Sequence, residues 1–202
     1  MDASTKSDSN AWRYIVNFLR SVVSSFRIDS NCVRVAVIRY ADRADVTIRW
    51  NQYNDVNGLL SGVQLLTLLG GGSNLATALQ AFQTLASGSA RSGARLVAGI
   101  VTDRLTCNQQ ITSLATSLKN QYSATIAGIA VTRTGAVQSG CLGQFVSPNL
   151  HAEITDYSQL NAYVSRIAQF LCVSTAPGPG PGPGPGPRPN LQPWGKRSTG
   201  KY

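Results

Sequence analysis

Hydrophobic residues recur every three or four positions in several long stretches of this chain. In the first of them, Trp12, Ile15 and Leu19 fall on one stripe. This spacing is typical of an amphipathic helix, and Asn74, which follows three glycines, is a suitable N-cap for the second stretch. The pattern predicts helices over residues 10–26, 74–86, 109–121 and 157–171.

The stretches between the predicted helices are short and rich in Val, Ile and Ala. Residues 32–40 carry a β-branched run, residues 45–50 alternate apolar and polar side chains, and a short turn joins the two. These two stretches should therefore form an antiparallel pair. Residues 95–102 and 124–131 are almost uninterrupted apolar runs, which indicates parallel strands covered on both faces. A last short strand is expected at residues 152–155.

Helix, hairpin and helix, followed by strands and helices in alternation, describe an α/β fold. We expect a doubly wound, mostly parallel sheet with one antiparallel edge strand and helices on both faces. A fold of this type normally begins with a buried central strand. Here the chain opens with MDASTKSDSN, a loop-like stretch that leads directly into the first helix. No predicted strand therefore fills the central position.

The composition changes abruptly at Ala176, where Pro and Gly begin to alternate. Alternating Pro and Gly cannot form a helix or a sheet ladder, and this segment lacks the Gly-X-Y period of collagen. We therefore divide the chain into a folded domain at residues 1–175 and a disordered Pro-Gly-rich tail at residues 176–202.

The 202 residues carry 18 Lys and Arg against 9 Asp and Glu, a formal net charge of +9. Four of the 18 lie in the tail, which leaves 14 against 9, or +5, for the folded part. A moderate excess of this kind suits an anionic partner or serves solubility alone. The Arg residues are scattered and form no dense basic helix, which disfavours nucleic acid as a partner. No apolar stretch is long enough to span a membrane, and no signal sequence is recognisable.

Catalytic motifs are absent from the sequence. His151 is the only histidine, and it falls in a predicted strand, where a surface or packing role is more usual than that of a general base. The sequence contains no nucleophile elbow, dinucleotide fingerprint or phosphate-binding loop, because the glycines at 70–72 are not followed by Lys. We therefore do not expect an enzyme.

The chain has four cysteines, which lie far apart without a CxxC pair. With a single histidine in the sequence, this spacing is poor for a zinc site. An even number allows two disulfides in any of three pairings, or four free thiols in a reducing compartment. The four are Cys32, Cys107, Cys141 and Cys172.

Three loops are expected at the carboxyl edge of the predicted sheet, where doubly wound folds bind their ligands. They are residues 2–7, 70–74 and 102–104. They bring two carboxylates, Asp2 and Asp103, together with several hydroxyl groups. Oxygen ligands of this kind suit a hard divalent cation such as Mg²⁺ or Ca²⁺.

The same segments resemble the von Willebrand factor A domains of extracellular matrix proteins, such as matrilins, collagen VI and invertebrate byssus or shell-matrix proteins. The resemblance rests on Asp2-x-Ser4 with Trp12 ten residues after the Asp, on RVAVIRY, on GGGSNLATAL and on IVTD. It covers essentially the whole folded part. It implies a metal-ion-dependent adhesion site with Asp2, Ser4, Ser73 and Asp103 as ligands, Ser73 standing where the family has Thr.

At the second serine of the family's D-x-S-x-S pattern this chain has Lys6. An ammonium group cannot coordinate a cation, and near Asp2 and Asp103 it would repel one. Either the site is degenerate and Lys6 compensates the acidic pair, or Lys6 turns outward and Ser7 replaces the missing ligand. A degenerate site is our working hypothesis.

The resemblance also gives the absent strand and the cysteines an interpretation. Family members place an apolar strand directly before this Asp, so we expect the central strand upstream of Met1 and regard the chain as N-terminally truncated. In the implied topology, Cys107 and Cys141 follow neighbouring strands at the ligand edge, whereas Cys32 and Cys172 lie at the opposite edge. This predicts the disulfides Cys107–Cys141 and Cys32–Cys172.

The resemblance implies a secreted adhesion module of the extracellular matrix. Its expected partner is a collagen-like matrix protein, or an acidic or mineral matrix component, bound through the loops at the carboxyl edge. An alternative is a structural matrix protein with no ligand at that site, in which the Pro-Gly tail tethers or assembles fibres.

Overall fold

The computed structural model describes residues 1–4 and 9–172, without the side chains of Ser9, Thr134 and residues 169–172. Lys6, Ser7 and the Pro-Gly tail at residues 176–202 lie outside the described residues. The expectations about these residues, and the domain boundary at 175, therefore stay predictions.

Helices and strands alternate along the described chain much as the hydrophobic pattern predicts. In chain order the elements are α1 (Ser9–Ser24), β1 (Val37–Tyr40), β2 (Ala44–Ile48), α2 (Val56–Gln64), α3 (Leu75–Ser89), β3 (Val97–Thr102), α4 (Gln109–Tyr122), β4 (Thr125–Val131), the 3₁₀ helix η1 (Thr132–Thr134), α5 (Cys141–Phe145), β5 (His151–Ile154), the 3₁₀ helix η2 (Tyr157–Tyr163) and α6 (Val164–Cys172).

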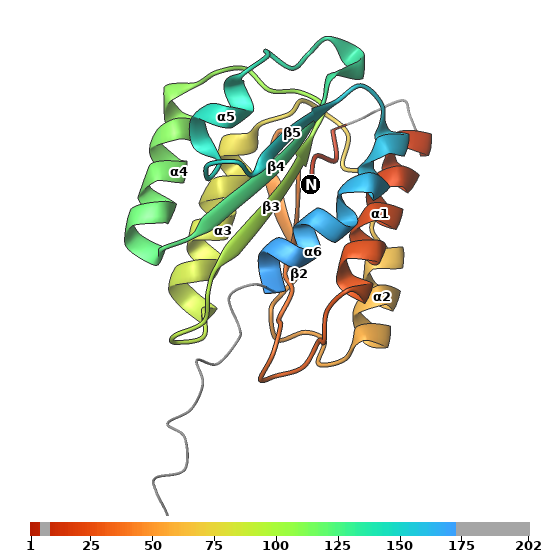
Figure 1. Ribbon diagram of the computed structural model, residues 1–202, viewed down its shortest axis with the longest axis vertical. Helices are drawn as coiled ribbons and strands as arrows, with labels where there is room; N and C mark the ends of the chain where they lie inside the picture. Colours follow the sequence, from red (N-terminus) through yellow and green to blue (C-terminus); the bar gives the residue numbers. More distant parts are fainter. Residues whose placement is uncertain (5–8, 173–202) are drawn as a thin grey trace, which may run out of the picture.

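The strands form two separate groups. β1 and β2 pair in antiparallel fashion, and β3, β4 and β5 form a parallel sheet in that order. Helices α1, α2 and α6 lie on one side of the strands, and α3, α4 and α5 lie on the other (Figure 1). The expected α/β class, with mostly parallel strands and an antiparallel edge strand, is confirmed.

Residues Met1–Ala3 join the two groups of strands. The Asp2 amide donates to the Val101 carbonyl at 2.9 Å, and the Ala3 amide donates to the Tyr40 carbonyl at 2.7 Å. The Tyr40 amide in turn donates to the Met1 carbonyl at 3.1 Å. The chain therefore starts between β1 and β3, in the middle of the sheet (Figure 1).

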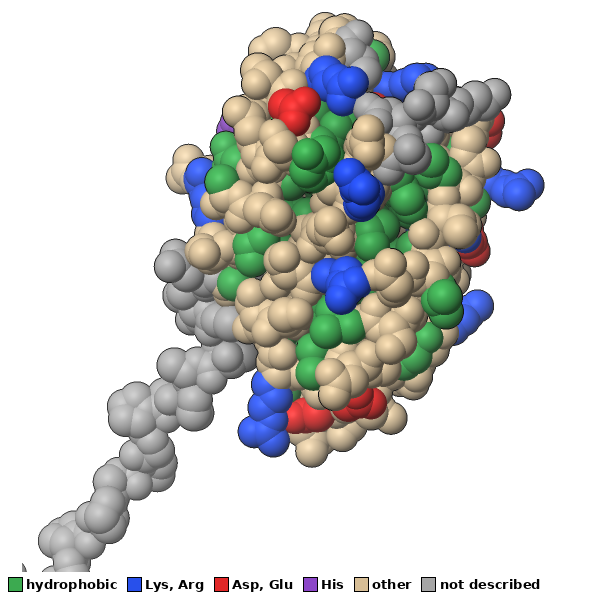
Figure 2. All heavy atoms as spheres, turned by 90° about the vertical axis from the view of Figure 1, so that its right-hand side faces the viewer, with side chains coloured by type: hydrophobic (Ala, Val, Ile, Leu, Met, Phe, Trp, Pro, Cys, Tyr) green, Lys and Arg blue, Asp and Glu red, His purple; other side chains and the backbone are tan. Residues whose placement is uncertain are grey.

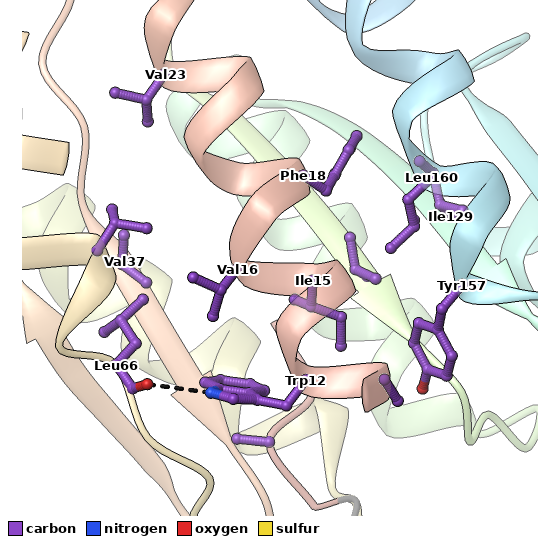
Figure 3. Close-up of a cluster of buried hydrophobic side chains, with 14 of the residues drawn as sticks. Trp12, Ile15, Val16, Phe18, Val23, Val37, Leu66, Ile129, Tyr157 and Leu160 are labelled. Atoms are coloured by element: carbon purple, nitrogen blue, oxygen red, sulfur yellow. Dashed lines mark hydrogen bonds between the residues drawn. The ribbon is translucent and has the colours of Figure 1, made fainter. Parts of the chain in front are cut away.

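Two hydrophobic clusters fill the space between the strands and the two helical layers. In the first cluster, Trp12 of α1 is buried, and its indole Nε1 donates to the Leu66 carbonyl at 3.0 Å (Figure 3). Ile15 of the predicted stripe is buried as well, whereas Leu19 is partly buried; Phe18, which the predicted stripe does not include, is also buried. Burial of each such side chain contributes about 1.5–3 kcal/mol to folding.

Several predicted elements differ from those observed. The strand predicted at 32–40 extends only from Val37 to Tyr40, and the helix predicted at 157–171 is divided into η2 and α6. The sequence pattern did not predict α2, which contains two glycines and therefore gives a weak helical signal. Gly62 is needed there, because a Cβ at this position would lie 2.6 Å from the Tyr53 ring.

Cys107 and Cys141 form a disulfide, with their Cα atoms 5.1 Å apart, which is the predicted pairing. A bridge across a loop of this length contributes about 3–4 kcal/mol. Cys32 is exposed and forms no disulfide with a described side chain. The side chain of Cys172 is outside the described ones, so the Cys32–Cys172 pairing stays a prediction.

Candidate metal centre

Asp2 lies at the carboxyl edge of the sheet, completely buried between β1 and β3. The backbone hydrogen bonds with Tyr40 and Val101 fix its position. One residue further on, the Ala3 carbonyl accepts hydrogen bonds from the amides of Leu69 and Gly70, both at 3.0 Å. The first residues of the chain therefore hold the glycine-rich loop against the end of the sheet.

The Asp2 carboxylate accepts four hydrogen bonds. Its Oδ1 accepts from the amide of Ser4 at 3.0 Å and from the hydroxyl of Ser4 at 2.5 Å. Its Oδ2 accepts from the Ser73 hydroxyl at 2.7 Å and from the Thr102 hydroxyl at 3.0 Å. The structure thus brings three of the four predicted ligands, Asp2, Ser4 and Ser73, into direct contact.

The glycines before Ser73 are required by the shape of this loop. Gly71 has a φ of 91°, and a Cβ there would lie 2.2 Å from the carboxylate of Asp42. The Gly72 amide donates to Asp42 Oδ1 at 2.9 Å. The positive φ favours glycine at position 71, and in this conformation the loop presents Ser73 to Asp2.

Asp103, the fourth predicted ligand, follows β3 directly and is 2% exposed. Burial raises the pKa of its carboxyl group above the ordinary value, and a hydrogen bond with Tyr157 opposes this shift. The negative charge of Asp2 raises the pKa of Asp103 further. Two carboxylates are therefore buried close enough for each to feel the other's charge.

The sequence reasoning missed two side chains of this cluster. Thr102 is fully buried and donates to Asp2, and its position directly before Asp103 in the motif IVTD was the available signal. Tyr40 is also buried, and within residues 1–4 and 9–172 its hydroxyl has no hydrogen-bond partner. Burial raises the pKa of Tyr40 well above its usual value, and the charge of Asp2 adds to this effect.

The donors at this edge fit a hard divalent cation, since all of them are carboxylate or hydroxyl oxygens. No described Lys or Arg forms an ion pair with Asp2; its charge is balanced by hydrogen bonds instead. The orphaned hydroxyl of Tyr40 marks a further polar atom beside the cluster. The side chains that would hold the ion are Asp2, Ser4, Ser73, Thr102 and Asp103.

Comparisons with known proteins identify the family of this domain. Residues 1–166 match the model of the von Willebrand factor type A domain. The structure is similar to proximal thread matrix protein 1 from the mussel byssus, with a TM-score of 0.74 and 17% identity over 85% of this chain and 44% of that one. The chain thus spans less than half the length of the mussel protein.

Two further structures bear on the site. One is the same mussel protein described with a zinc-occupied MIDAS motif, with a TM-score of 0.75 and 17% identity over 85% of this chain and 44% of that one. The other is the manganese-loaded TRAP protein of Plasmodium vivax, with a TM-score of 0.61 and 18% identity over 83% of this chain and 70% of that one. At such identities the likeness shows the fold, and the match over residues 1–166 shows the family. The chain belongs to the von Willebrand factor type A domain family.

Proposed function

We propose that this chain is an extracellular adhesion module that binds a matrix partner through the loops at the carboxyl edge of its sheet. The observation that carries the proposal is the buried cluster of Asp2, Ser4, Ser73, Thr102 and Asp103 at that edge. Domains of this family are typically binding modules without catalysis. The partner we propose is a collagen-like protein or an acidic or mineral component of the matrix.

The charge around the cluster supports an anionic partner. Arg43, Arg104 and Arg133 are exposed and stand in the loops that follow β1, β3 and β4. Acidic side chains stand beside them: Asp42 accepts from the Gly72 amide and Asp156 from the Ser158 amide, and both keep their negative charge. We propose that the exposed arginines of this mixed-charge edge contact acidic groups of the partner.

Basic side chains over α1 and α2 do not gather into a patch. On the face that carries α1 and α2, the Lys and Arg side chains stand apart from one another (Figure 2). In the part of the chain that the structure describes, no helix is both long and apolar enough to cross a membrane.

The cation site supports binding but is weakened by Lys6. When bound, a divalent cation would supply positive charge for a carboxylate of the partner. Asp2 already has four hydrogen-bond donors, so this carboxylate is satisfied without the ion. With Lys6 in place of a serine ligand, we propose that the site is degenerate and that Mg²⁺ or Ca²⁺ binds weakly.

A matrix location is the third part of the proposal. The Cys107–Cys141 disulfide and the fold shared with a byssus matrix protein support secretion into an oxidising environment. Exposed Cys32 is available for the proposed bridge to Cys172. Mass spectrometry of the non-reduced protein after proteolysis would identify both bridges, and a free thiol at Cys32 in the secreted protein would contradict the second one.

The cation proposal is tested by calorimetry with Mg²⁺, Ca²⁺ and Mn²⁺. We expect little or no heat for the 202-residue chain and at least tenfold tighter binding for Lys6→Ser, because this change removes a positive charge and adds a hydroxyl ligand. Lys201→Ser is the matched control and should leave binding unchanged. Micromolar affinity of the unchanged chain would overturn the degenerate site.

The partner proposal is tested by solid-phase binding to fibrillar collagen and to an immobilised acidic polymer such as polyglutamate. We expect Arg104→Ala with Arg133→Ala to lower binding to the acidic polymer about tenfold, as a loss of long-range attraction predicts. The matched control, Arg13→Ala with Arg27→Ala, removes the same charge from residues outside the edge loops. Binding by residues 176–202 alone, and not by residues 1–175, would favour the fibre-tether alternative.

A further inference from the structure

Several arginines stand at the amino edge of the sheet, opposite the cation cluster. Residues 27–34 follow α1, residues 49–55 follow β2, and residues 89–95 lead into β3, so all three segments lie at this edge (Figure 1). Hydrogen bonds join the first segment to each of the other two. The three segments carry a formal charge of +3, from Arg27, Arg34, Arg49, Arg91 and Arg95 against Asp29 and Asp55.

Two of these arginines meet on one carbonyl oxygen. Arg34 donates to the Ser30 carbonyl from Nε at 3.2 Å and from Nη2 at 3.0 Å, and Arg91 Nη1 donates to the same oxygen at 2.8 Å. Arg34 Nη2 and Arg91 Nη1 are therefore no more than about 5.8 Å apart, the sum of their two distances to that oxygen. Two positive charges this close repel each other, and a neutral carbonyl does not compensate them.

The acidic side chains of this edge bond elsewhere. Asp29 pairs with Arg27 at 2.8 Å, and Asp55 caps the first turn of α2. Both keep their negative charge, but among the described side chains neither forms an ion pair with Arg34 or Arg91. The pair of guanidinium groups therefore lacks a counter-ion within the part of the chain that the structure describes.

The surrounding loops hold both guanidinium groups in place. Arg34 Nη1 also donates to Asn51 Oδ1, and Arg91 Nη2 donates to the Cys32 carbonyl, both at 2.8 Å. Of the five N–H donors of each guanidinium, these bonds use three on Arg34 and two on Arg91, which leaves donors on both for a ligand. Because the two half-buried side chains are already fixed, little conformational entropy is lost when a ligand binds.

Two exposed arginines extend the pair along the edge. Arg49 follows β2, Arg34 precedes β1, and Arg91 and Arg95 precede β3. The strands lie in the order β2, β1, β3, with Met1–Ala3 bonded between the last two. The four arginines therefore form a row across three strand spacings, roughly 14 Å. We call these four side chains the arginine row.

The row favours a linear ligand with tetrahedral acidic groups. A sulfate ester has three terminal oxygens that accept hydrogen bonds, whereas a carboxylate has two, so a sulfate uses more of the donors that converge between Arg34 and Arg91. The neighbouring aromatic rings are occupied, since Trp50 packs on Phe82 and Tyr53 lies against Gly62. No stacking platform for nucleic acid bases is therefore present among the described residues of this edge.

We propose that the arginine row binds a sulfated linear polysaccharide, with one sulfate between Arg34 and Arg91 and further acidic groups on Arg49 and Arg95. This site goes beyond the function proposed above, and only the choice of an extracellular polyanion rests on it. The row lies at the edge opposite the cation cluster and the loops proposed to bind the matrix partner. Its test is therefore independent of binding at the carboxyl edge.

The probe is a heparin hexasaccharide, titrated into the 202-residue chain by calorimetry at about 0.15 M salt. We expect a Kd on the order of 10 µM, and at least tenfold weaker binding for Arg34→Gln with Arg91→Gln. Arg13→Gln with Arg20→Gln is the matched control, because these arginines of α1 also donate to uncharged side chains. The control should bind as the unchanged chain does. Equal losses in both variants would show that binding follows net charge and would overturn the site.

A second variant leaves every hydrogen bond of the arginines in place. Ser92→Glu adds a negative charge at an exposed residue beside Arg91 and should weaken the hexasaccharide about fivefold without changing the Tm. Ser113→Glu, at an exposed position of α4, is its control and should leave binding unchanged. If the double arginine variant does not fold, this pair decides, and equal binding by Ser92→Glu and Ser113→Glu would overturn the proposal.

Two further comparisons separate the ligand classes and the two edges. Arg34→Gln with Arg91→Gln should bind polyglutamate as the unchanged chain does; a loss equal to that for heparin would overturn the polysaccharide in favour of an acidic protein. Arg104→Ala with Arg133→Ala should leave heparin binding unchanged. A loss of heparin binding in that variant alone would place the polysaccharide at the carboxyl edge and overturn the arginine row. Failure of the chain to bind collagen or polyglutamate would contradict the proposed function and leave the heparin result unaffected.

Discussion

The two ends of the gap between β1 and β3 differ in how the chain fills them. At the carboxyl end, Met1–Ser4 bond to both neighbouring strands, and Asp2 gathers hydrogen bonds from Ser4, Ser73 and Thr102. At the amino end the same two strands face a cavity of about 420 Å³. Met1–Ser4 thus complete the hydrogen bonds of the polar site, whereas the rest of the gap is lined by apolar side chains of the neighbouring strands and helices.

The geometry of the site and the stability of the sheet therefore depend on different interactions. The polar cluster depends on short-range hydrogen bonds among residues that are already buried. The remainder of the gap is lined by apolar side chains, and burial of apolar area is the dominant favourable contribution to folding. We therefore expect substitutions at the two ends to behave differently.

Asp2→Ala should give the largest effect, because it removes the one side chain that ties the strand ends to the glycine loop. We expect a loss of about 4 kcal/mol in the free energy of unfolding, since the hydroxyls of buried Ser4 and Thr102 and of half-buried Ser73 lose a charged acceptor. Urea denaturation of the 202-residue chain measures it. Asp42→Ala is the control: Asp42 is exposed and should cost about 1 kcal/mol. Equal losses would mean that the hydrogen bonds of Asp2 contribute no more to stability than the one of Asp42.

A pair of glycines in adjacent strands gives the next largest contrast. Gly128 in β4 is packed, because a Cβ there would lie 2.7 Å from Leu142 Cδ1, and Leu142 is fully buried. Gly128→Ala should therefore cost about 1–3 kcal/mol. Gly99→Ala should be neutral or stabilise by up to about 1 kcal/mol, since its surroundings are open.

The same denaturation series compares the two glycine variants directly. A loss at Gly99 as large as that at Gly128 would mean that the surroundings of Gly99 are as closely packed as those of Gly128.

Asp103→Asn should have a smaller effect of the opposite sign. Burial raises the pKa of Asp103, so the folded state holds this proton more tightly than the unfolded state. The stability linked to the protonated group is therefore present below pH 3.8 and lost as pH rises through the folded pKa. At pH 7 the amide should stabilise the chain by at most about 1 kcal/mol, and at about pH 3 the gain should vanish.

Urea midpoints of the unchanged chain and of Asp103→Asn at both pH values check this prediction. The variant should also weaken any Mn²⁺ binding seen with Lys6→Ser, because it removes a carboxylate ligand. A destabilised Asp103→Asn at pH 7 would show that the Asp103 charge is well compensated in the folded chain.

The sequence predicted most of the helices and strands because their apolar periods are long and regular, as in α1, β3 and β4. It also predicted that Asp2, Ser4 and Ser73 meet, since strand ends in a parallel sheet share an edge. It placed Thr102 in a loop at this edge but gave it no role, although its position before Asp103 in IVTD was a signal. It missed Tyr40, because a buried hydroxyl within an apolar run carries no local signal. Helix α2 escaped prediction for another reason: Gly62 lowers helix propensity but is required by the contact with Tyr53.

Asp45→Asn should give the smallest effect, because its ion pair joins β1 to β2 at a position that is partly exposed to solvent. Arg39 Nη2 lies 2.6 Å from Asp45 Oδ2, and the Thr47 hydroxyl lies 3.1 Å from the same oxygen. The hydrogen bond from Arg39 holds the pKa of Asp45 below its ordinary value. The Asp45 side chain is 44% exposed, so solvent screens the pair and the expected loss at pH 7 is about 0.5–1 kcal/mol.

The sign of the pH dependence distinguishes Asp45 from Asp103. Because the folded pKa of Asp45 is lowered, its contribution is present above pH 3.8 and is lost as pH falls through the folded pKa. Asp45→Asn should therefore destabilise the chain at pH 7 and become neutral in strong acid, whereas Asp103→Asn stabilises it at pH 7. A double-mutant cycle with Arg39→Gln measures the pair, and a coupling energy near zero would contradict it.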